Sequence, residues 1–189
     1  MAALAGAVLG GRQGGTGAVG GGLLALLGSL AFSAWKNRDA TGGSAAPQTA
    51  EELAREAPLG LREPQSPQEE AQLEQTALLA IRAMINAAKA DGAIDGAEMG
   101  KIMGKLKEFG SDDEARDFVM SELQKPFDLD GLVAAVNNPE LAVQVYGASL
   151  LAIEVDTPAE REYLQKLADK LGLDKETVCY IHETLGVAT

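Results

Sequence analysis

The stretch LLAIEVDTPAEREYLQKLADKLGL, Leu150 to Leu173, contains the end of one predicted helix and both the start and the end signals of the next helix. Thr157, Pro158 and Glu160 form a T-P-x-E capping box, in which the threonine oxygen accepts a backbone N–H of the first turn and the glutamate accepts the N–H of the capping residue. Gly172 then provides the left-handed position at which helices commonly end. The stretch therefore predicts one helix with defined boundaries, followed by an Asp-started turn into another.

The same arrangement occurs 62 positions earlier in the chain. Glycine, acidic and apolar positions agree at this offset: Gly110 with Gly172, Asp112 with Asp174, Glu114 with Glu176, Leu79 with Leu141, Ile81 with Val143, Ile102 with Leu164, Phe109 with Leu171, Phe118 with Tyr180, Val119 with Ile181 and Leu123 with Leu185. We interpret this agreement as an internal duplication, with repeats at about 77–123 and 139–185. Each repeat predicts three helices.

The duplicated part predicts an all-α domain at residues 67–189, because no strand-like alternating run occurs in it. Ser66, Pro67 and Glu69 give the start signal of its first helix. The apolar face expected on that helix consists of Leu78, Ile81, Ile85 and Ala88. Since short helices cannot bury such faces alone, we expect the two three-helix units to form one bundle about a pseudo-two-fold axis.

Charge and cysteine content exclude several classes of protein. The chain of 189 residues has a formal net charge of −12 and a pI of about 4.5. A surface of that sign repels phosphate backbones, so no nucleic-acid partner is expected. Cys179 is the single cysteine and His182 the single histidine, which excludes an intramolecular disulfide and a Cys/His zinc cluster. We expect Cys179 to be a buried, inert thiol and His182 to be exposed.

The first third of the chain is rich in Gly and Ala and has no charged residue from Gln13 to Trp35. A helix needs about 20 apolar residues to cross a bilayer, and Trp35 followed by Lys36 is typical of an interfacial anchor. We therefore expect residues 1–36 to be a membrane anchor, with a transmembrane helix through residues 13–35. A disordered Gly-rich arm and a cleaved signal peptide remain as alternatives.

Further expectations follow from the residues in and after this segment. Glycines spaced four apart, such as Gly17 and Gly21, let helices approach closely in lipid, which predicts a homo-oligomer through this segment. The cations Lys36 and Arg38 place the C-terminal domain on the cytoplasmic side. Residues 37–66 contain several prolines and few large hydrophobic residues, so they are expected to be a linker.

The domain from about Ala71 to Val187 resembles the tellurite-resistance, TerB-like all-helical domain. The Gly-rich hydrophobic N-terminus, the run ADGAIDGAE at Ala90–Glu98 and the stretch at Leu150–Leu173 together resemble the YebE-type bacterial inner-membrane proteins, whose domain has no assigned function. This resemblance implies a TerB-like bundle. It also implies a bacterial inner-membrane location.

The resemblance further implies a divalent-cation site in paired acidic turns. Its ligands would be Asp91, Asp95 and Glu98 in the first turn and Glu154, Asp156 and Glu160 in the second. Oxygen ligands of this kind suit Ca²⁺ or Mg²⁺, although the run is not an EF-hand. The residues themselves also predict helix caps, because Asp95 and Glu98 form a D-x-x-E capping box. A hydrolase that uses paired carboxylates is a third reading, but no aromatic pocket accompanies the acids.

These observations predict a membrane-anchored, non-enzymatic helical module that binds or scaffolds an unknown protein partner. The resemblance links it to envelope or metal stress. We expect no catalytic residues, and no cofactor besides Ca²⁺ or Mg²⁺. The alternative is a soluble ion-binding sensor whose N-terminal tract is a disordered or self-associating arm.

Overall fold

The computed structural model describes residues 23–39, 64–90, 92, 94, 113–153 and 155–187. Within these ranges it contains seven helices and no strands, which confirms the all-α class. The helices are α2 (Leu23–Asp39), α4 (Pro67–Ala88), α6 (Asp113–Gln124), α7 (Leu129–Ala134), α8 (Pro139–Ala152), α9 (Pro158–Leu171) and α10 (Lys175–Leu185).

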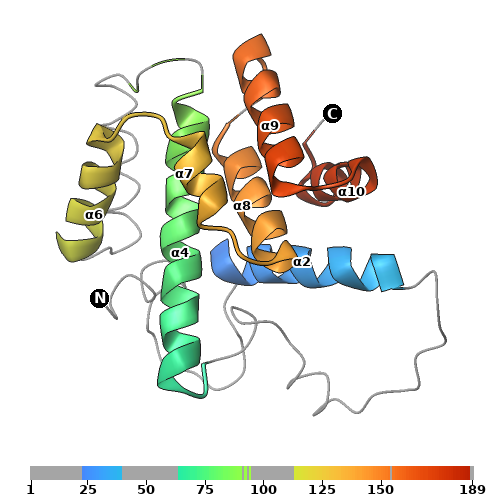
Figure 1. Cartoon of the computed structure of the whole chain (residues 1–189), viewed down its shortest axis with the longest axis horizontal. Helices are drawn as coiled ribbons and strands as arrows, with labels where there is room; N and C mark the ends of the chain where they lie inside the picture. The colour runs from blue at the N-terminus through green and yellow to red at the C-terminus, as the bar shows by residue number, and fades with distance from the viewer. Residues whose placement is uncertain are drawn as a thin grey trace.

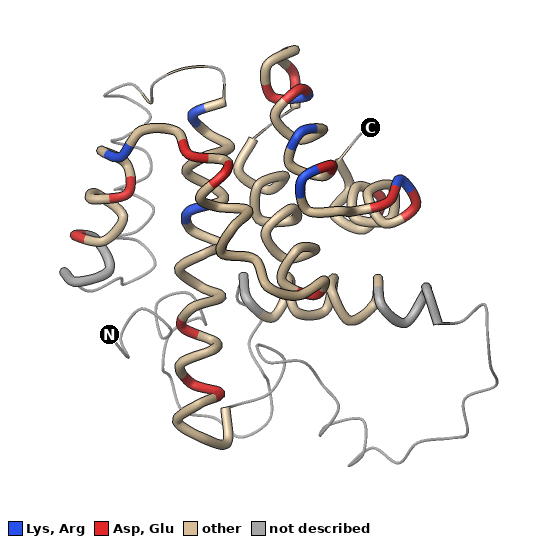
Figure 2. Tube along the Cα trace, viewed as in Figure 1, with Lys and Arg blue, Asp and Glu red and all other residues tan. Residues whose placement is uncertain are grey.

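Helix α8 is the centre of the bundle. All of its residues from Ala142 to Leu150 are buried, and it contacts α2, α4, α9 and α10. Figure 1 shows α8 between α4 on one side and α9 and α10 on the other, with α2 crossing near its start. Its one charged residue, Glu140, lies in the first turn, whereas Figure 2 shows charges along α4, α6, α9 and α10. A helix that is apolar on every side is stable only when enclosed in this way.

The start and end signals predicted at Ser66, Thr157 and Gly172 are confirmed, whereas those at Asp95 and Gly110 lie outside the described residues. Glu69 N donates to Ser66 Oγ at 3.2 Å at the start of α4. At the start of α9, Glu160 N donates to Thr157 Oγ1, also at 3.2 Å, and the reciprocal bond of the capping box is present. Gly172 ends α9 with a φ of +68°, a conformation that glycine adopts without strain. These contacts span three or four residues, which is why the sequence alone reveals them.

The buried face of α4 differs from the predicted one. The row that packs in the core is Leu73, Ala77, Ala80, Ala83 and Ala87, and small side chains of this kind let the axes of packed helices lie close together. Of the four predicted core residues only Ile85 is buried, and it faces α6 rather than α8. There it forms a second, smaller cluster with Val119 and Leu123. Helix α4 therefore has two apolar faces, one toward α8 and one toward α6.

Two expectations about α10 are wrong. His182 is buried, with 6% of its surface exposed, whereas Cys179 is exposed. The reason is the angle at which α10 docks, since it turns Thr177, Ile181 and His182 inward. His182 is four residues from Val178 and three from Leu185, so helical spacing was a usable signal that it lies beside the apolar face.

Helix α2 packs on the bundle instead of standing apart from it. Its buried residues are Ala25, Leu27, Leu30, Ala31 and Ala34, and it contacts α8 and α10. In the described ranges no helix has both the length and the apolar character that crossing a membrane requires. The predicted transmembrane helix through residues 13–35 therefore has no support here, and its first part lies outside the described residues.

The bounds of two helices agree with the predicted offset of 62, since α6 begins at Asp113 and α10 at Lys175. Each packs beside a longer helix, α6 on α4 and α10 on α8. The middle helix expected in the first repeat falls in residues 95–112, outside the described part of the chain. The duplication therefore stays a prediction.

Candidate functional site

Only two of the six expected cation ligands are in the described residues. Asp91, Asp95, Glu98 and Glu154 lie outside them. The other two, Asp156 and Glu160, lie at the start of α9. Among the described residues, no three Asp, Glu, His or Cys side chains form a group that could hold a metal ion. The site as a whole therefore stays a prediction.

Glu160 has the environment of a helix cap. With 8% of its surface exposed, its Oε2 accepts the N–H of Asp156 at 3.2 Å, the N–H of Thr157 at 2.9 Å and the Thr157 hydroxyl at 2.8 Å. Burial opposes ionisation, but the hydrogen bonds from Thr157 and Asp156 outweigh it and lower the pKa of Glu160. Because this oxygen already has three donors, the side chain as placed fits the cap rather than a metal ligand.

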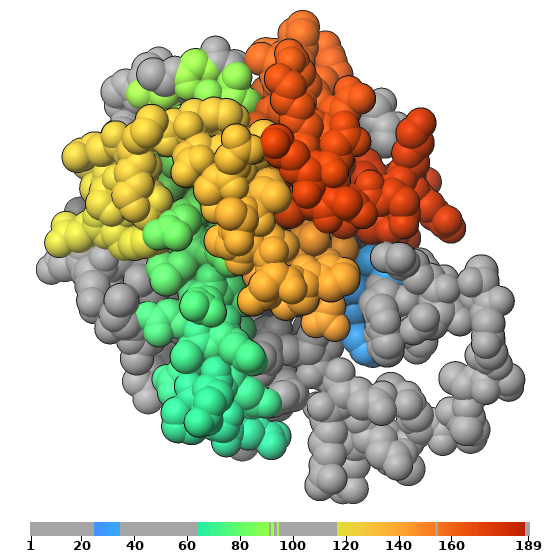
Figure 3. Space-filling model, viewed as in Figure 1, coloured from blue at the N-terminus to red at the C-terminus, as the bar shows by residue number. Residues whose placement is uncertain are grey.

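A pocket of about 290 Å³ lies where α4 meets the end of α6, the connection after it and α7. Figure 3 shows side chains of α4 at the surface between α6 and α7. Its apolar lining is Leu79, Ile85, Pro126, Leu132 and Ala135, and its polar lining is Arg82, Asn86, Lys89, Glu122, Lys125 and Asp128. A small concave site with an apolar floor and a few polar groups is the usual form of a ligand site.

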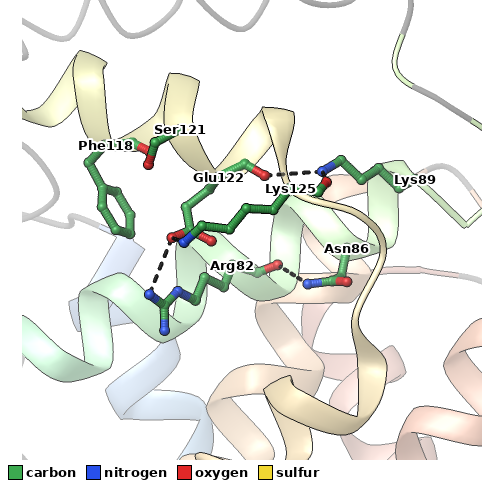
Figure 4. A network of polar contacts seen from close by, with 7 residues as sticks. All are labelled: Arg82, Asn86, Lys89, Phe118, Ser121, Glu122 and Lys125. Atoms are coloured by element: carbon green, nitrogen blue, oxygen red, sulfur yellow. Dashed lines mark hydrogen bonds and ion pairs between the residues drawn. The ribbon is translucent and has the colours of Figure 1, made fainter.

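Helix α4 supplies three of the polar groups from one face. Arg82, Asn86 and Lys89 follow one another at spacings of four and three residues, which places them in a row along the helix. Figure 4 shows this row opposite the last turns of α6. Asn86 Oδ1 accepts the N–H of Asp128 at 2.9 Å, so the row also holds the connection to α7.

Lys89 caps the C-terminal end of α6. Its Nζ donates to the carbonyl oxygens of Glu122 at 3.1 Å and of Lys125 at 2.6 Å. The last carbonyls of a helix lack partners within the helix and carry partial negative charge, so an ammonium group is favourable there. Burial lowers the pKa of Lys89, and the nearby charge of Glu122 opposes this only in part.

Glu122 is the buried anion of the site. Its side chain is 7% exposed, and its Oε1 pairs with Arg82 Nη2 at 3.2 Å and with Lys125 Nζ. The Arg82 guanidinium also lies over the Phe118 ring, 5.9 Å from its centroid, near the outer limit of a cation–π contact. Arg82 Nε is buried and has no hydrogen-bond partner within the described residues.

The remaining buried polar groups belong to the core. Tyr146 Oη lies 3.0 Å from His182 Nε2, and Ser149 Oγ lies 3.2 Å from Tyr163 Oη. Burial is the main cause that raises the pKa of each tyrosine to about 12, so both hydroxyls stay neutral and act as hydrogen-bonding groups. These contacts join α8 to α9 and α10 away from the pocket.

The sequence analysis missed the pocket residues. Arg82 and Lys89 lie off the apolar face predicted for α4, which is the usual pattern of a solvated helix surface. The spacing of Arg82, Asn86 and Lys89 was a usable signal that α4 has a second, polar docking face. Their partners Glu122 and Asp128 lie 40 and 42 residues away, so no local pattern predicts the contacts.

Comparison with known proteins identifies the family. A curated relative from Yersinia enterocolitica, named "Uncharacterized protein in ampR 5'region", is 30% identical over 114 residues, which cover 60% of this chain and 82% of that protein. No solved structure gives a significant match. The family described as "Protein of unknown function (DUF533)" matches residues 1–185. The chain therefore belongs to this family, which is TerB-like, as the resemblance of its helical domain indicated.

Proposed function

We propose that this protein is a non-enzymatic binding module whose ligand site is the pocket between α4, α6 and α7. The observation that carries the proposal is the row Arg82, Asn86 and Lys89, which holds polar groups in fixed positions beside an apolar floor. Side chains already held by hydrogen bonds lose little entropy when a ligand binds, which favours affinity.

The composition of the pocket supports binding over catalysis. Among the described residues its lining includes no Ser, Thr, Cys or His, which are common nucleophiles or, for His, the commonest general base. Its one buried carboxylate, Glu122, is shared by two cations. Its Oε1 is therefore already engaged by two salt bridges.

A thermal-stability screen tests this function. We would heat the full chain with a set of small metabolites and compare it with Ala135→Trp, which fills the mouth of the pocket, and with Ala134→Trp as a matched control. Ala135 lines the pocket, and Ala134 is exposed beside it on α7 but does not. A ligand at about 100 times its Kd stabilises a protein by about 2.7 kcal/mol. We expect such a shift in the wild type and in Ala134→Trp, and none in Ala135→Trp; equal shifts in all three would disprove the proposal.

The proposal includes attachment to the bacterial inner membrane, as in the YebE-type proteins, and Lys36 and Arg38 favour a cytoplasmic helical domain. The uncharged run from Gln13 to Trp35 supports it, and so does the exposure of Leu26 on α2, at 43%. If the full chain stays with membranes through a high-salt wash, attachment is supported, whereas release by salt favours the ion-binding sensor without an anchor.

A role in envelope or metal stress, with Ca²⁺ or Mg²⁺ in the acidic turns, is the remaining part of the proposal. Its support is the TerB-like family and the acids Asp91, Asp95 and Glu98. Calorimetric titration of each cation into the full chain and into Asp91→Asn/Asp95→Asn tests it. We expect micromolar binding that the double variant loses, and an absence of binding in the wild type would remove the cation from the proposal.

A further inference from the structure

The charges around the pocket between α4, α6 and α7 do not balance. Three cations, Arg82, Lys89 and Lys125, line it. Glu122 is shared by Arg82 and Lys125, and Asp128 accepts the N–H of Gly131 at 2.8 Å as the cap of α7. The lining therefore has an excess of positive charge in a chain whose formal net charge is −12. The excess is one positive charge, three cations against two carboxylates, and a concave surface with an excess of one sign attracts ions of the opposite sign.

Within the described part of the chain, two of these cations lack a full set of charged partners. Lys89 Nζ donates to two neutral carbonyl oxygens, and burial lowers its pKa more than Glu122 raises it. Arg82 Nε is a buried donor with no acceptor within the described residues. An unpaired buried donor costs free energy that a suitable acceptor restores. Nε itself is closed to solvent, but the Arg82 side chain as a whole is 41% exposed, so an oxyanion can approach its guanidinium beside Lys89.

The size and floor of the pocket limit what accompanies this oxyanion. Its volume of about 290 Å³ is at the lower end of the usual range for ligand sites, roughly 300–1,000 Å³. Leu79, Leu132 and Ala135 offer an apolar surface beside the cations. A short hydrocarbon chain gains from contact with that surface, whereas inorganic phosphate does not. Phosphate also carries more negative charge, which the acidic surface and Glu122 oppose.

We infer that the pocket binds a small aliphatic carboxylate, with its carboxylate group between Arg82 and Lys89 and its hydrocarbon chain against Leu79 and Leu132. This inference rests on the proposed binding function and specifies its ligand class. The planar guanidinium of Arg82 matches the geometry of a carboxylate. The same chemistry is available from a free organic acid and from the C-terminal residue of a peptide.

Calorimetric titration of the full chain with hexanoate tests the inference. Hexanamide, which has nearly the same shape and no charge, and inorganic phosphate serve as comparison probes. We expect hexanoate to bind at least tenfold more tightly than either. Equal affinity for hexanoate and hexanamide would show that the apolar floor acts alone, and tighter binding of phosphate would show a different anion class; each result overturns the inference.

Variants locate the binding. Lys89→Gln should weaken hexanoate at least tenfold, and Ala135→Trp should abolish its binding. Lys166→Gln on α9, whose ammonium pairs with Glu162 instead, should leave the affinity unchanged. Far-UV circular dichroism establishes that each variant is folded. If Lys89→Gln unfolds α6, the hexanoate affinity of Ala135→Trp still tests the location of the site. Unchanged hexanoate affinity in Ala135→Trp would overturn the inference, because the acid would then bind elsewhere.

The failure of this inference differs from the failure of the proposed function. If hexanoate does not bind but other compounds stabilise the wild type and not Ala135→Trp, the pocket is a ligand site for another class, and only the carboxylate inference is lost. If no compound separates the wild type from Ala135→Trp, both are lost. Titration with acetyl-leucyl-leucine, with a free carboxyl group or as its amide, distinguishes a peptide C-terminus from a free organic acid as the source of the carboxylate. A free-carboxyl peptide that binds more tightly than hexanoate would assign the site to a protein C-terminus.

Discussion

Gly147 of α8 lies so close to Leu30 of α2 that a Cβ atom on it would stand 2.8 Å from Leu30 Cδ2 and 3.3 Å from Leu27 Cδ2. The absence of a side chain therefore sets how closely α2 approaches the central helix. Leu27 and Leu30 are fully buried by this contact. The N-terminal helix is thus part of the core of the domain.

Gly147→Leu should separate α2 from α8. Overpacking of this kind costs about 1–3 kcal/mol, and we expect a lower urea midpoint together with faster proteolysis between α2 and α4. The sign of the change in unfolding free energy is informative, because Leu stabilises a helix by nearly 1 kcal/mol relative to Gly at a position on which nothing packs. Leu26→Ala, on the exposed side of α2, is the control and should have little effect. A stabilised Gly147→Leu protein would show that α2 does not dock on α8 in solution.

Glu122→Gln should loosen α6 from α4. The change removes a buried charge that pairs with Arg82 and Lys125, and because both partners are about half exposed we expect a cost of about 1–2 kcal/mol. Hydrogen exchange should show faster opening of α6 before the rest of the domain unfolds. Glu162→Gln, which removes a surface pair with Lys166, should not change stability measurably. Equal effects of the two variants would contradict the role assigned to Glu122.

Glu160 should make stability depend on pH in the acid range. Its pKa is lowered in the folded protein, since the hydrogen bonds from Thr157 and Asp156 outweigh burial. Its contribution is therefore complete above the pKa of the unfolded chain and is lost as the pH falls through the lower, folded value. The stability difference between the wild type and Glu160→Gln should be largest near neutral pH and should narrow in acid. Thermal unfolding at several pH values measures it, and a difference that stays constant would refute the assignment.

Tyr146→Phe should cost about 1–3 kcal/mol. The tyrosine hydroxyl is the partner of His182 Nε2, and His182 Nδ1 already has no hydrogen-bond partner within the described residues. The variant therefore leaves a buried imidazole without any partner there. Tyr180→Phe is the control for loss of a hydroxyl, because Tyr180 lies on α10 with His182 and is only partly buried. Chemical denaturation measures the unfolding free energy of both variants. If Tyr146→Phe loses no more stability than Tyr180→Phe, the hydrogen bond between Tyr146 and His182 is contradicted.

Short-range signals made much of this fold predictable. The caps at Ser66, Thr157 and Gly172 depend on hydrogen bonds between residues three or four positions apart, so the residue types alone reveal them. The same holds for the cap role of Glu160. The acidic turns were harder to interpret, because a cap and an oxygen ligand for a cation use the same side chains.

The sequence by itself determined the helical class, the helix caps at Ser66, Thr157 and Gly172, and the family, whereas it did not reveal α7 as a helix. Tertiary structure alone decided which faces are buried: it turned His182 inward and Cys179 outward, and it docked α2 against Gly147. It also assembled the pocket, by bringing Arg82 and Lys89 to Glu122 across 40 and 33 residues of chain. The physical reason is the distance along the chain over which each kind of interaction acts. Capping energies act within one turn, whereas the orientation of an amphipathic helix depends on which neighbours the whole chain packs around it.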